Sequence, residues 1–205
     1  MTARAEGGER ARAVDMDDQE ARERVLAAAG ELFYLRGITA VGMDDIRARS
    51  GVPLKRLYRA FPAKERLAEA YLARRDEQWL AALAGEVDRH RDPQQRALAP
   101  FAFLAGWFAT PDFRGCAFIN AFGELGSTSD GVAQLARRHK QRLHSYLTGL
   151  AADAGAKDPG DLGTQLLLLM DGAIIAAATG AAERPAASAL AAARALLAAS
   201  VTAAT

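Results

Sequence analysis

The sequence predicts an all-α protein of about nine helices, with a short N-terminal three-helix unit followed by a larger helical domain. Alanine and leucine dominate the composition, β-branched residues are sparse, and the long periodic stretches repeat every 3.6 residues. No segment alternates as a strand would. Half of the 205 residues are hydrophobic, which is enough to form a substantial core.

Several classes of protein are excluded by composition. A single cysteine, Cys116, rules out an internal disulfide framework, and the first eighteen residues are too charged for a secretory signal. The apolar run 166–180 contains Asp171 and is shorter than the roughly twenty residues of a membrane-spanning helix. The histidines show no metal-ligand spacing. We therefore expect a cytoplasmic protein without a membrane segment, metal site or cofactor.

Residues 1–17 mix arginine, glutamate and glycine without periodicity, and a flexible arm is expected there. Arg4, Arg10 and Arg12 could touch nucleic acid, although the neighbouring acids weaken that reading. The first helix should follow, because Asp17 and Glu20 form a capping-box pattern and an apolar stripe begins at Val25. Gly37 ends this helix.

Residues 43–61 read as two short helices joined by a tight turn, which is a helix-turn-helix. Ser50 and Gly51 interrupt the first helix, and Pro53 stands at the start of the second. The second helix should bury one face and expose a cationic one. Residues 47–66 hold seven basic side chains and one acidic one, a net charge of +6 in a chain whose total is only +1. This concentration of positive charge favours a localised polyanion as partner.

A long helix should then run from about residue 64 to about 89. Beyond Pro93, seven of the fourteen aromatic residues lie between residues 101 and 122, which predicts a second core. One helix should end near Thr110, with Pro100 kinking it or delaying its start. The next carries Cys116 and Phe122, and a glycine- and serine-rich loop follows it.

Three more helices are expected at about 130–153, 161–180 and from Pro185 to about Val201. The first contains the basic run 137–142, including His139, which is typical of a solvated face. The other two are rich in alanine and glycine, which allow helices to approach closely. They could be core or interface. Because the preceding helices already supply a core, we expect a homodimer through a four-helix bundle formed by two copies of this pair.

At this point the residues resemble the TetR family of bacterial transcriptional regulators. The resemblance rests on Gly37, on Asp45-Ile46-Arg47, on Ser50-Gly51-Val52, on Leu57-Tyr58 and on the stretch 61–67, Phe-Pro-Ala-Lys-Glu-Arg-Leu. The stretches 107–120 and 166–173 also look like parts of the family, so that the resemblance covers roughly residues 18–180. It implies a helix-turn-helix DNA-binding domain at 18–66 and a helical effector-binding and dimerisation domain at 67–205.

The departures from the family pattern concern the residues that cap the helices and the residues expected to contact DNA bases. Val41-Gly42 replaces a hydroxyl pair, while Pro53 and Ala63 stand where capping side chains are usual. A missing cap costs about 1 kcal/mol, so that tertiary packing must compensate. Lys55-Arg56 replaces a small pair, and the operator sequence therefore does not follow from relatives.

The resemblance implies that the second motif helix enters the major groove of double-stranded DNA. Lys55 and Arg56 are expected to read bases, with arginine favouring guanine, while Tyr58, Arg59 and Lys64 hold phosphates and Arg47 supports the same face. A homodimer implies a near-palindromic operator.

The family also implies a small-molecule effector in the second domain, which shifts the long helix and releases DNA. The expected pocket is aromatic with a few polar groups. Its candidate residues are Trp79, Phe103, Trp107, Cys116, Asn120, Glu124, His144, Tyr146, Met170 and Asp171.

Two other functions stay open at the level of sequence. A helical interaction module could keep the helix-turn-helix fold without binding an operator, since the hydroxyls that could contact phosphate are missing at positions 41 and 42. An all-helical enzyme is disfavoured, because the chain contains no GxSxG, CxxC, HExxH or Walker motif.

Overall fold

A computed structural model describes residues 17–201, and these form nine α-helices and no strand. The expectation of an all-α fold is therefore confirmed for this part of the chain. The helices are α1 (Asp18–Arg36), α2 (Met43–Ser50), α3 (Leu54–Ala60), α4 (Lys64–Val87), α5 (Pro93–Phe108), α6 (Ala117–Leu125), α7 (Asp130–Asp153), α8 (Pro159–Thr179) and α9 (Pro185–Ser200). The arm expected at residues 1–17, with its three arginines, lies almost wholly outside the described residues.

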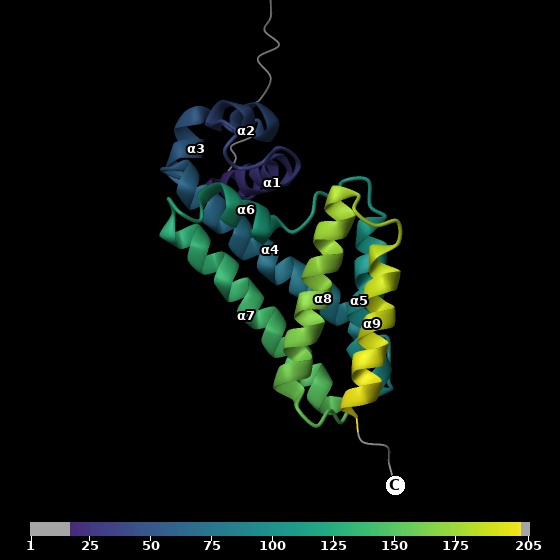
Figure 1. The fold of residues 1–205 in the computed structure, drawn as a ribbon. Coiled ribbons are helices and arrows are strands. Elements are labelled where there is room, and N and C mark those ends of the chain that lie inside the picture. Colours follow the sequence, from purple (N-terminus) through teal and green to yellow (C-terminus); the bar gives the residue numbers. More distant parts are fainter. Residues whose placement is uncertain (1–16, 202–205) are drawn as a thin grey trace, which may run out of the picture.

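Helices α1–α3 form a head at one end of the molecule, and α4 runs from the head into the body formed by α5 and α7–α9 (Figure 1). Helix α6 lies between the head and α7 in this view. Helix α4 spans the expected domain boundary at residues 66 and 67, because the helix is continuous from Lys64 to Val87. Any rotation of α4 in the body therefore moves the head.

The helix ends follow local sequence rules. Asp17 caps α1 by accepting a hydrogen bond from the Glu20 N–H at 2.6 Å, and Asp92 caps α5 by accepting from Gln95 at 2.9 Å. Pro93, Pro159 and Pro185 stand in the first turn of their helices, where a missing N–H costs nothing.

Helix α5 starts at Pro93 and continues past Pro100 to Phe108, so that the delayed start, one of the two alternatives predicted for Pro100, is wrong. Pro100 is buried within it, so that packing outweighs the hydrogen bond that proline removes.

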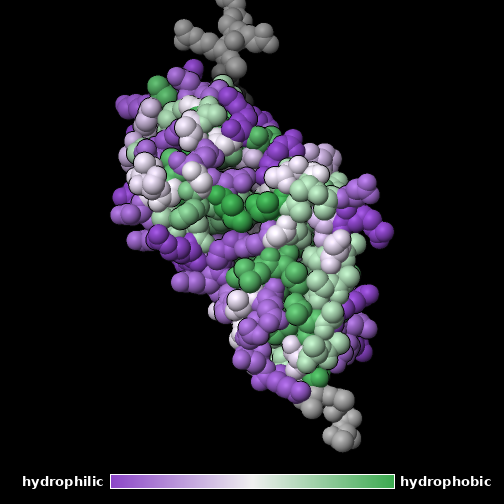
Figure 2. Space-filling view, in the orientation of Figure 1, coloured by the Kyte–Doolittle hydropathy of each residue, from purple (hydrophilic) through white to green (hydrophobic). Residues whose placement is uncertain are grey.

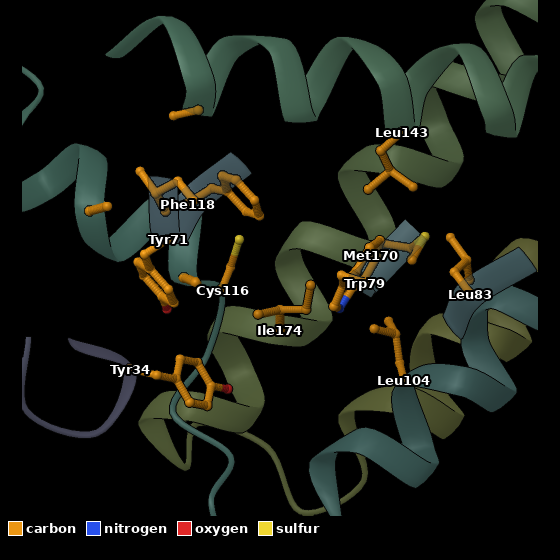
Figure 3. Packing of buried hydrophobic residues seen from close by; sticks show 14 of the residues in the cluster. Tyr34, Tyr71, Trp79, Leu83, Leu104, Cys116, Phe118, Leu143, Met170 and Ile174 are labelled. Atoms are coloured by element: carbon orange, nitrogen blue, oxygen red, sulfur yellow. The ribbon is translucent and has the colours of Figure 1, made fainter. Parts of the chain in front are cut away.

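Two groups of buried side chains position the functional parts. In the head, Ile46 of α2 and Leu57 of α3 are fully buried with Phe33 of α1. In the body, Leu104, Leu143 and Met170 come from three different helices and are also fully buried (Figure 3). Helix α4 packs against α1 of the head and against α5 and α7 of the body, and apolar burial at about 25 cal/mol per Å² stabilises both contacts.

Candidate DNA-binding surface and effector cavity

The α2–α3 unit is a rigid helix-turn-helix. Helix α2 ends at Gly51, whose φ of +66° is the left-handed conformation that glycine adopts without strain, and the Gly51 N–H donates to the Arg47 carbonyl at 3.0 Å. Two residues later Pro53 precedes α3. Because Ile46 and Leu57 are fully buried, the outer face of α3 is held in a fixed orientation.

Arginines of α1 cap the C-terminal ends of both motif helices. Arg24 donates to the Ser50 carbonyl at 2.8 Å, and Arg22 donates to the Ala60 carbonyl at 3.0 Å while its guanidinium lies 4.3 Å from the centre of the Phe61 ring. Cations are favourable at helix C-termini, where the unpaired carbonyls carry partial negative charge. These contacts supply the tertiary compensation that the weak N-caps require.

The N-caps are as poor as the sequence predicts. Gly42, Pro53 and Ala63 precede α2, α3 and α4 and make no side-chain cap. At α2 the roles are reversed, because the Gly42 N–H donates to Asp45 Oδ2 at 2.9 Å. The first N–H groups of α3 and α4 therefore have no side-chain acceptor from their own caps, and they are suited to an anion such as phosphate.

The residues expected to face DNA lie largely on the outer side of the head. Lys55, Tyr58 and Arg59 are exposed, and Arg56 is half-buried. Arg59 forms an ion pair with Asp18 at 3.5 Å, and Arg47 pairs with Asp44 at 3.4 Å. Exposed ion pairs of this kind contribute only about 0–1 kcal/mol, so both arginines can exchange a carboxylate for a phosphate.

Lys64 has a different position from the one expected. Its ammonium donates to the carbonyls of Ile38 at 3.0 Å, Thr39 at 3.3 Å and Val41 at 3.0 Å. An ammonium has three N–H donors, and three carbonyls of the α1–α2 loop occupy them. Lys64 therefore holds the loop, and its ammonium would have to leave these carbonyls to bind a phosphate.

Comparisons with known proteins agree with this geometry. Residues 25–71 match the family model described as bacterial regulatory proteins, tetR family. The HTH-type transcriptional regulator YjdC of Escherichia coli is 27% identical over 156 residues, which are 75% of this chain and 81% of that protein. The crystal structure of a TetR-family transcriptional regulator from Streptomyces coelicolor aligns with a TM-score of 0.83 and 30% identity over 90% of this chain and 97% of that one. This chain belongs to the TetR family.

As a TetR-family protein the chain is a DNA-binding transcriptional regulator and not an enzyme. A TetR-family regulator from Cytophaga hutchinsonii, only 14% identical, aligns with a TM-score of 0.79 over 91% of this chain and shows that the fold persists at low identity.

The body of this TetR-family regulator contains an aromatic cavity between α4, α5, α6, α7 and α8. Trp79, Trp107 and Cys116, all expected from sequence, line it together with Phe118 and Ile174. In Figure 3, Phe118 and Cys116 lie on one side and Trp79 and Met170 on the other, with Ile174 between them. The free volume of about 10 Å³ holds about one water molecule. A larger ligand would have to displace a side chain.

Two further expected residues pack beside this cavity. The Phe103 ring meets Trp79 edge-on at 5.3 Å between centroids, and Met170 is fully buried. The Trp79 indole N–H is buried without a hydrogen-bond acceptor among residues 17–201. It is thus a donor available to a polar atom of a ligand.

The polar residues proposed from sequence do not join them in the cavity. Asn120 donates to the Arg114 carbonyl at 2.9 Å, His144 is bonded to Thr164, and Asp171 is paired with Lys140. Each side chain therefore has a protein partner outside the cavity. The pattern of apolar residues in the sequence does not show which partner a polar side chain will meet.

Glu124 and Tyr146 are also placed elsewhere. Tyr146 lines a surface groove with Leu80, away from the tryptophans. Glu124 accepts hydrogen bonds from the Ile38 and Thr39 N–H groups of the head at 3.2 and 2.7 Å. Glu124 thus makes a contact between body and head and does not line the aromatic cavity.

A buried ionic cluster is the feature that sequence reasoning missed. His139 and Asp76 are 2% and 1% exposed, and His139 Nδ1 lies 2.7 Å from Asp76 Oδ1. Arg142 donates to the other oxygen of Asp76 at 2.5 Å, and the His139 ring stacks on Phe118 with 3.7 Å between centroids. Since a carboxylate only accepts, neutral His139 carries its proton on Nδ1.

A signal for this cluster was present in the sequence. His139 continues the buried stripe of α7, three residues after Ala136 and four before Leu143. Arg137 and Arg138 are exposed because they fall on other faces of the helix, whereas Lys140 pairs with Asp171 and Arg142 with Asp76.

The burial of His139 predicts a pH-dependent stability. Desolvation holds the pKa of His139 below its ordinary value of 6.5, and the hydrogen bond to Asp76 opposes that shift only in part. As pH falls below 6.5, His139 becomes protonated in the unfolded chain while it stays neutral in the folded protein. The free energy of unfolding should therefore decrease from pH 6.5 downwards.

Urea unfolding at pH 7.5 and 5.5 measures this effect. A variant with His90→Gln and His144→Gln keeps His139 as the single histidine of the chain, and it should retain the pH dependence. Its imidazole should titrate below 6.5 by NMR. A titration at or above 6.5 would contradict the prediction.

Proposed function

We propose that this TetR-family regulator is a repressor, which binds a near-palindromic operator as a homodimer and which a small hydrophobic or amphipathic ligand releases. The observation that carries the proposal is the outer face of α3, where Lys55, Tyr58 and Arg59 are exposed on a helix fixed by buried Leu57. A recognition helix needs a rigid base and a few long polar side chains that reach base edges.

In this proposal α3 lies in the major groove. Lys55 and Arg56 contact bases, and a bidentate arginine would favour guanine in each half-site by roughly 1–3 kcal/mol. Arg47, Tyr58 and Arg59 bind phosphates. The N–H groups at the start of α4 add to phosphate binding, whereas Lys64 acts indirectly by holding the α1–α2 loop.

The dimer is proposed to form through α8 and α9. Leu168 and Ile175 are 66% and 45% exposed, and with Gly172 they follow one face of α8. The corresponding face of α9 is lined by alanines, including Ala187 and Ala191. Figure 2 shows this apolar surface running down both helices.

The composition of α8 fits the same proposal. Within residues 17–201 this helix is long and apolar enough to cross a membrane, yet only 33% of its apolar stretch is buried in one copy of the chain. A helix that packs into a core on one side and onto a second copy on the other has this composition. We therefore assign it to an interface in the cytoplasm, where the operator DNA is.

The effector is proposed to enter from the groove between α6 and α7. This apolar groove has a volume of about 360 Å³, and Phe118 borders both the groove and the inner cavity. Movement of Phe118 would join the two spaces. The groove also has Arg137 at its edge, so that an amphipathic molecule finds both an apolar wall and a charge.

Operator binding is tested by selecting DNA from a random pool with the full chain and by a gel shift of the DNA upstream of its own coding region. We expect a near-palindromic consensus and retardation that survives unrelated competitor DNA. Retardation that the competitor abolishes would favour the alternative, a helical interaction module. Compounds are then screened for release, with fluorescence of the cavity-lining Trp79 and Trp107 reporting on the body.

A further inference from the structure

The loop between α1 and α2 is held from two sides by opposite charges. Glu124 of α6 accepts from the N–H groups of Ile38 and Thr39 at 3.2 and 2.7 Å, while Lys64 at the start of α4 donates to the carbonyls of Ile38, Thr39 and Val41. The peptide unit between Ile38 and Thr39 thus donates to Glu124 and accepts from Lys64. Each charge polarises this peptide toward the other, so that the two contacts strengthen one another.

The loop backbone is shaped to admit Glu124. Gly37 has a φ of +85°, and a Cβ atom built there would lie 3.0 Å from Glu124 Oε1. A side chain at position 37 would therefore be strained and would crowd the carboxylate. Thus the glycine that ends α1 also makes room for the contact between head and body.

Helix α6 connects this contact to the aromatic cavity. Phe118 in its first turn lines the cavity and stacks on His139, and Glu124 follows six residues later, about 9 Å along the helix. Just before α6, the hydroxyl of Tyr34 donates to the Gly115 carbonyl at 3.1 Å and accepts from the Arg114 N–H at 3.0 Å. The segment from Arg114 to Glu124 therefore contacts the head at both ends and the cavity between them.

We infer that Glu124 is a positioning residue that couples the aromatic cavity to helices α2 and α3 through the loop at residues 37–41. Displacement of Phe118 moves α6 and withdraws the Glu124 carboxylate from the loop. The loop then loses its contact with α6 and keeps only its contact with Lys64 of α4, so that α2, which begins at Met43, is no longer held in position relative to α6. Glu124 is exposed, so that water can replace the loop and the contact can open at small cost. The role of a ligand in this displacement rests on the proposed function, whereas the coupling itself does not.

Amide hydrogen exchange of the full-length chain, followed by NMR without DNA or ligand, tests the contact. Glu124→Ala should speed exchange of the Ile38 and Thr39 amides by about tenfold or more, because both lose their acceptor. Glu124→Gln keeps one acceptor oxygen and should give an intermediate rate. Asp153→Ala removes an exposed carboxylate at the far end of α7 and should change neither amide.

Transmission from the cavity is tested with Phe118→Leu, which shortens the side chain without adding polarity. This substitution should speed exchange at Ile38 and Thr39 in the natural background and have no further effect at these amides in the Glu124→Ala background. Equal effects in both backgrounds would overturn the coupling, as would unchanged exchange of the two amides in Glu124→Ala. The amide at Val52, inside the turn, serves as an internal control and should keep its rate in all variants.

Operator binding separates this inference from the proposed function. If the exchange pattern is as expected and no specific DNA is bound, the proposed function fails while the coupling stands. If specific DNA is bound and the exchange rates do not change, the coupling is overturned and the proposed function stands.

Discussion

Raising the salt concentration from 50 to 200 mM is expected to weaken operator binding by roughly 10³- to 10⁵-fold, as for a protein that neutralises about six to ten phosphates. Each head is proposed to use Arg47, Lys55, Arg56 and Arg59 for this purpose, and Lys64 is not counted because its donors bind the loop. Two heads thus provide a number of cations within that range. Two of the four are held only by exposed ion pairs, which open at little cost.

The slope of affinity against salt identifies the face that contacts DNA. Lys55→Ala removes one cation per head and should lower the slope of log K against log salt by about two for the dimer. Lys157→Ala removes an exposed lysine of the α7–α8 loop and should leave the slope unchanged. If the two variants have the same slope, α3 is not the DNA-contacting helix. A flat salt response of the unsubstituted protein would reject electrostatic DNA binding altogether.

Replacing both Leu168 and Ile175 by arginine is expected to convert the dimer to monomers and to weaken operator binding by about 10²- to 10⁴-fold. A dimer binds its second half-site from an effectively high local concentration, and a monomer loses that advantage. Burying four guanidinium groups in an apolar bundle would cost more than the interface provides. Arginine is preferred to glutamate here because added positive charge cannot repel DNA.

Analytical ultracentrifugation and the selected operator measure the two consequences. Leu35→Arg, at a leucine that is 40% exposed on α1, controls for the addition of an arginine at an exposed leucine outside the proposed interface and should remain dimeric. A double variant that stays dimeric would place the interface elsewhere. A monomeric variant that keeps full operator affinity would show that one head suffices for binding.

Most of the fold could be predicted from sequence because helices are specified by local features. Periodic apolar residues, the caps Asp17 and Asp92 and the prolines in first turns act within about one helical turn of themselves. The helix-turn-helix was recognisable for the same reason, since its turn, buried face and cationic face all lie within residues 43–61.

The polar contacts could not be predicted in this way. Lys64 has the sequence context of a phosphate-binding residue, yet its donors are taken by a loop more than twenty residues earlier in the chain. Glu124 reaches amides 85 and 86 residues away. His139 lies within a basic run, and its burial depends on α4 and α6 covering one face of α7.

The sequence by itself determined that this protein is helical, roughly where most of its helices lie, and that its positive charge gathers on one short motif. The tertiary structure alone decided which charged side chains remain available to DNA and which hold the protein together. The physical reason is that a helix needs only its own neighbours, whereas a charged group binds whichever opposite charge or dipole the packed helices place within hydrogen-bond distance. Glu124 and Lys64 meet on one loop because α6 and α4 pack there, and neither local sequence contains that information.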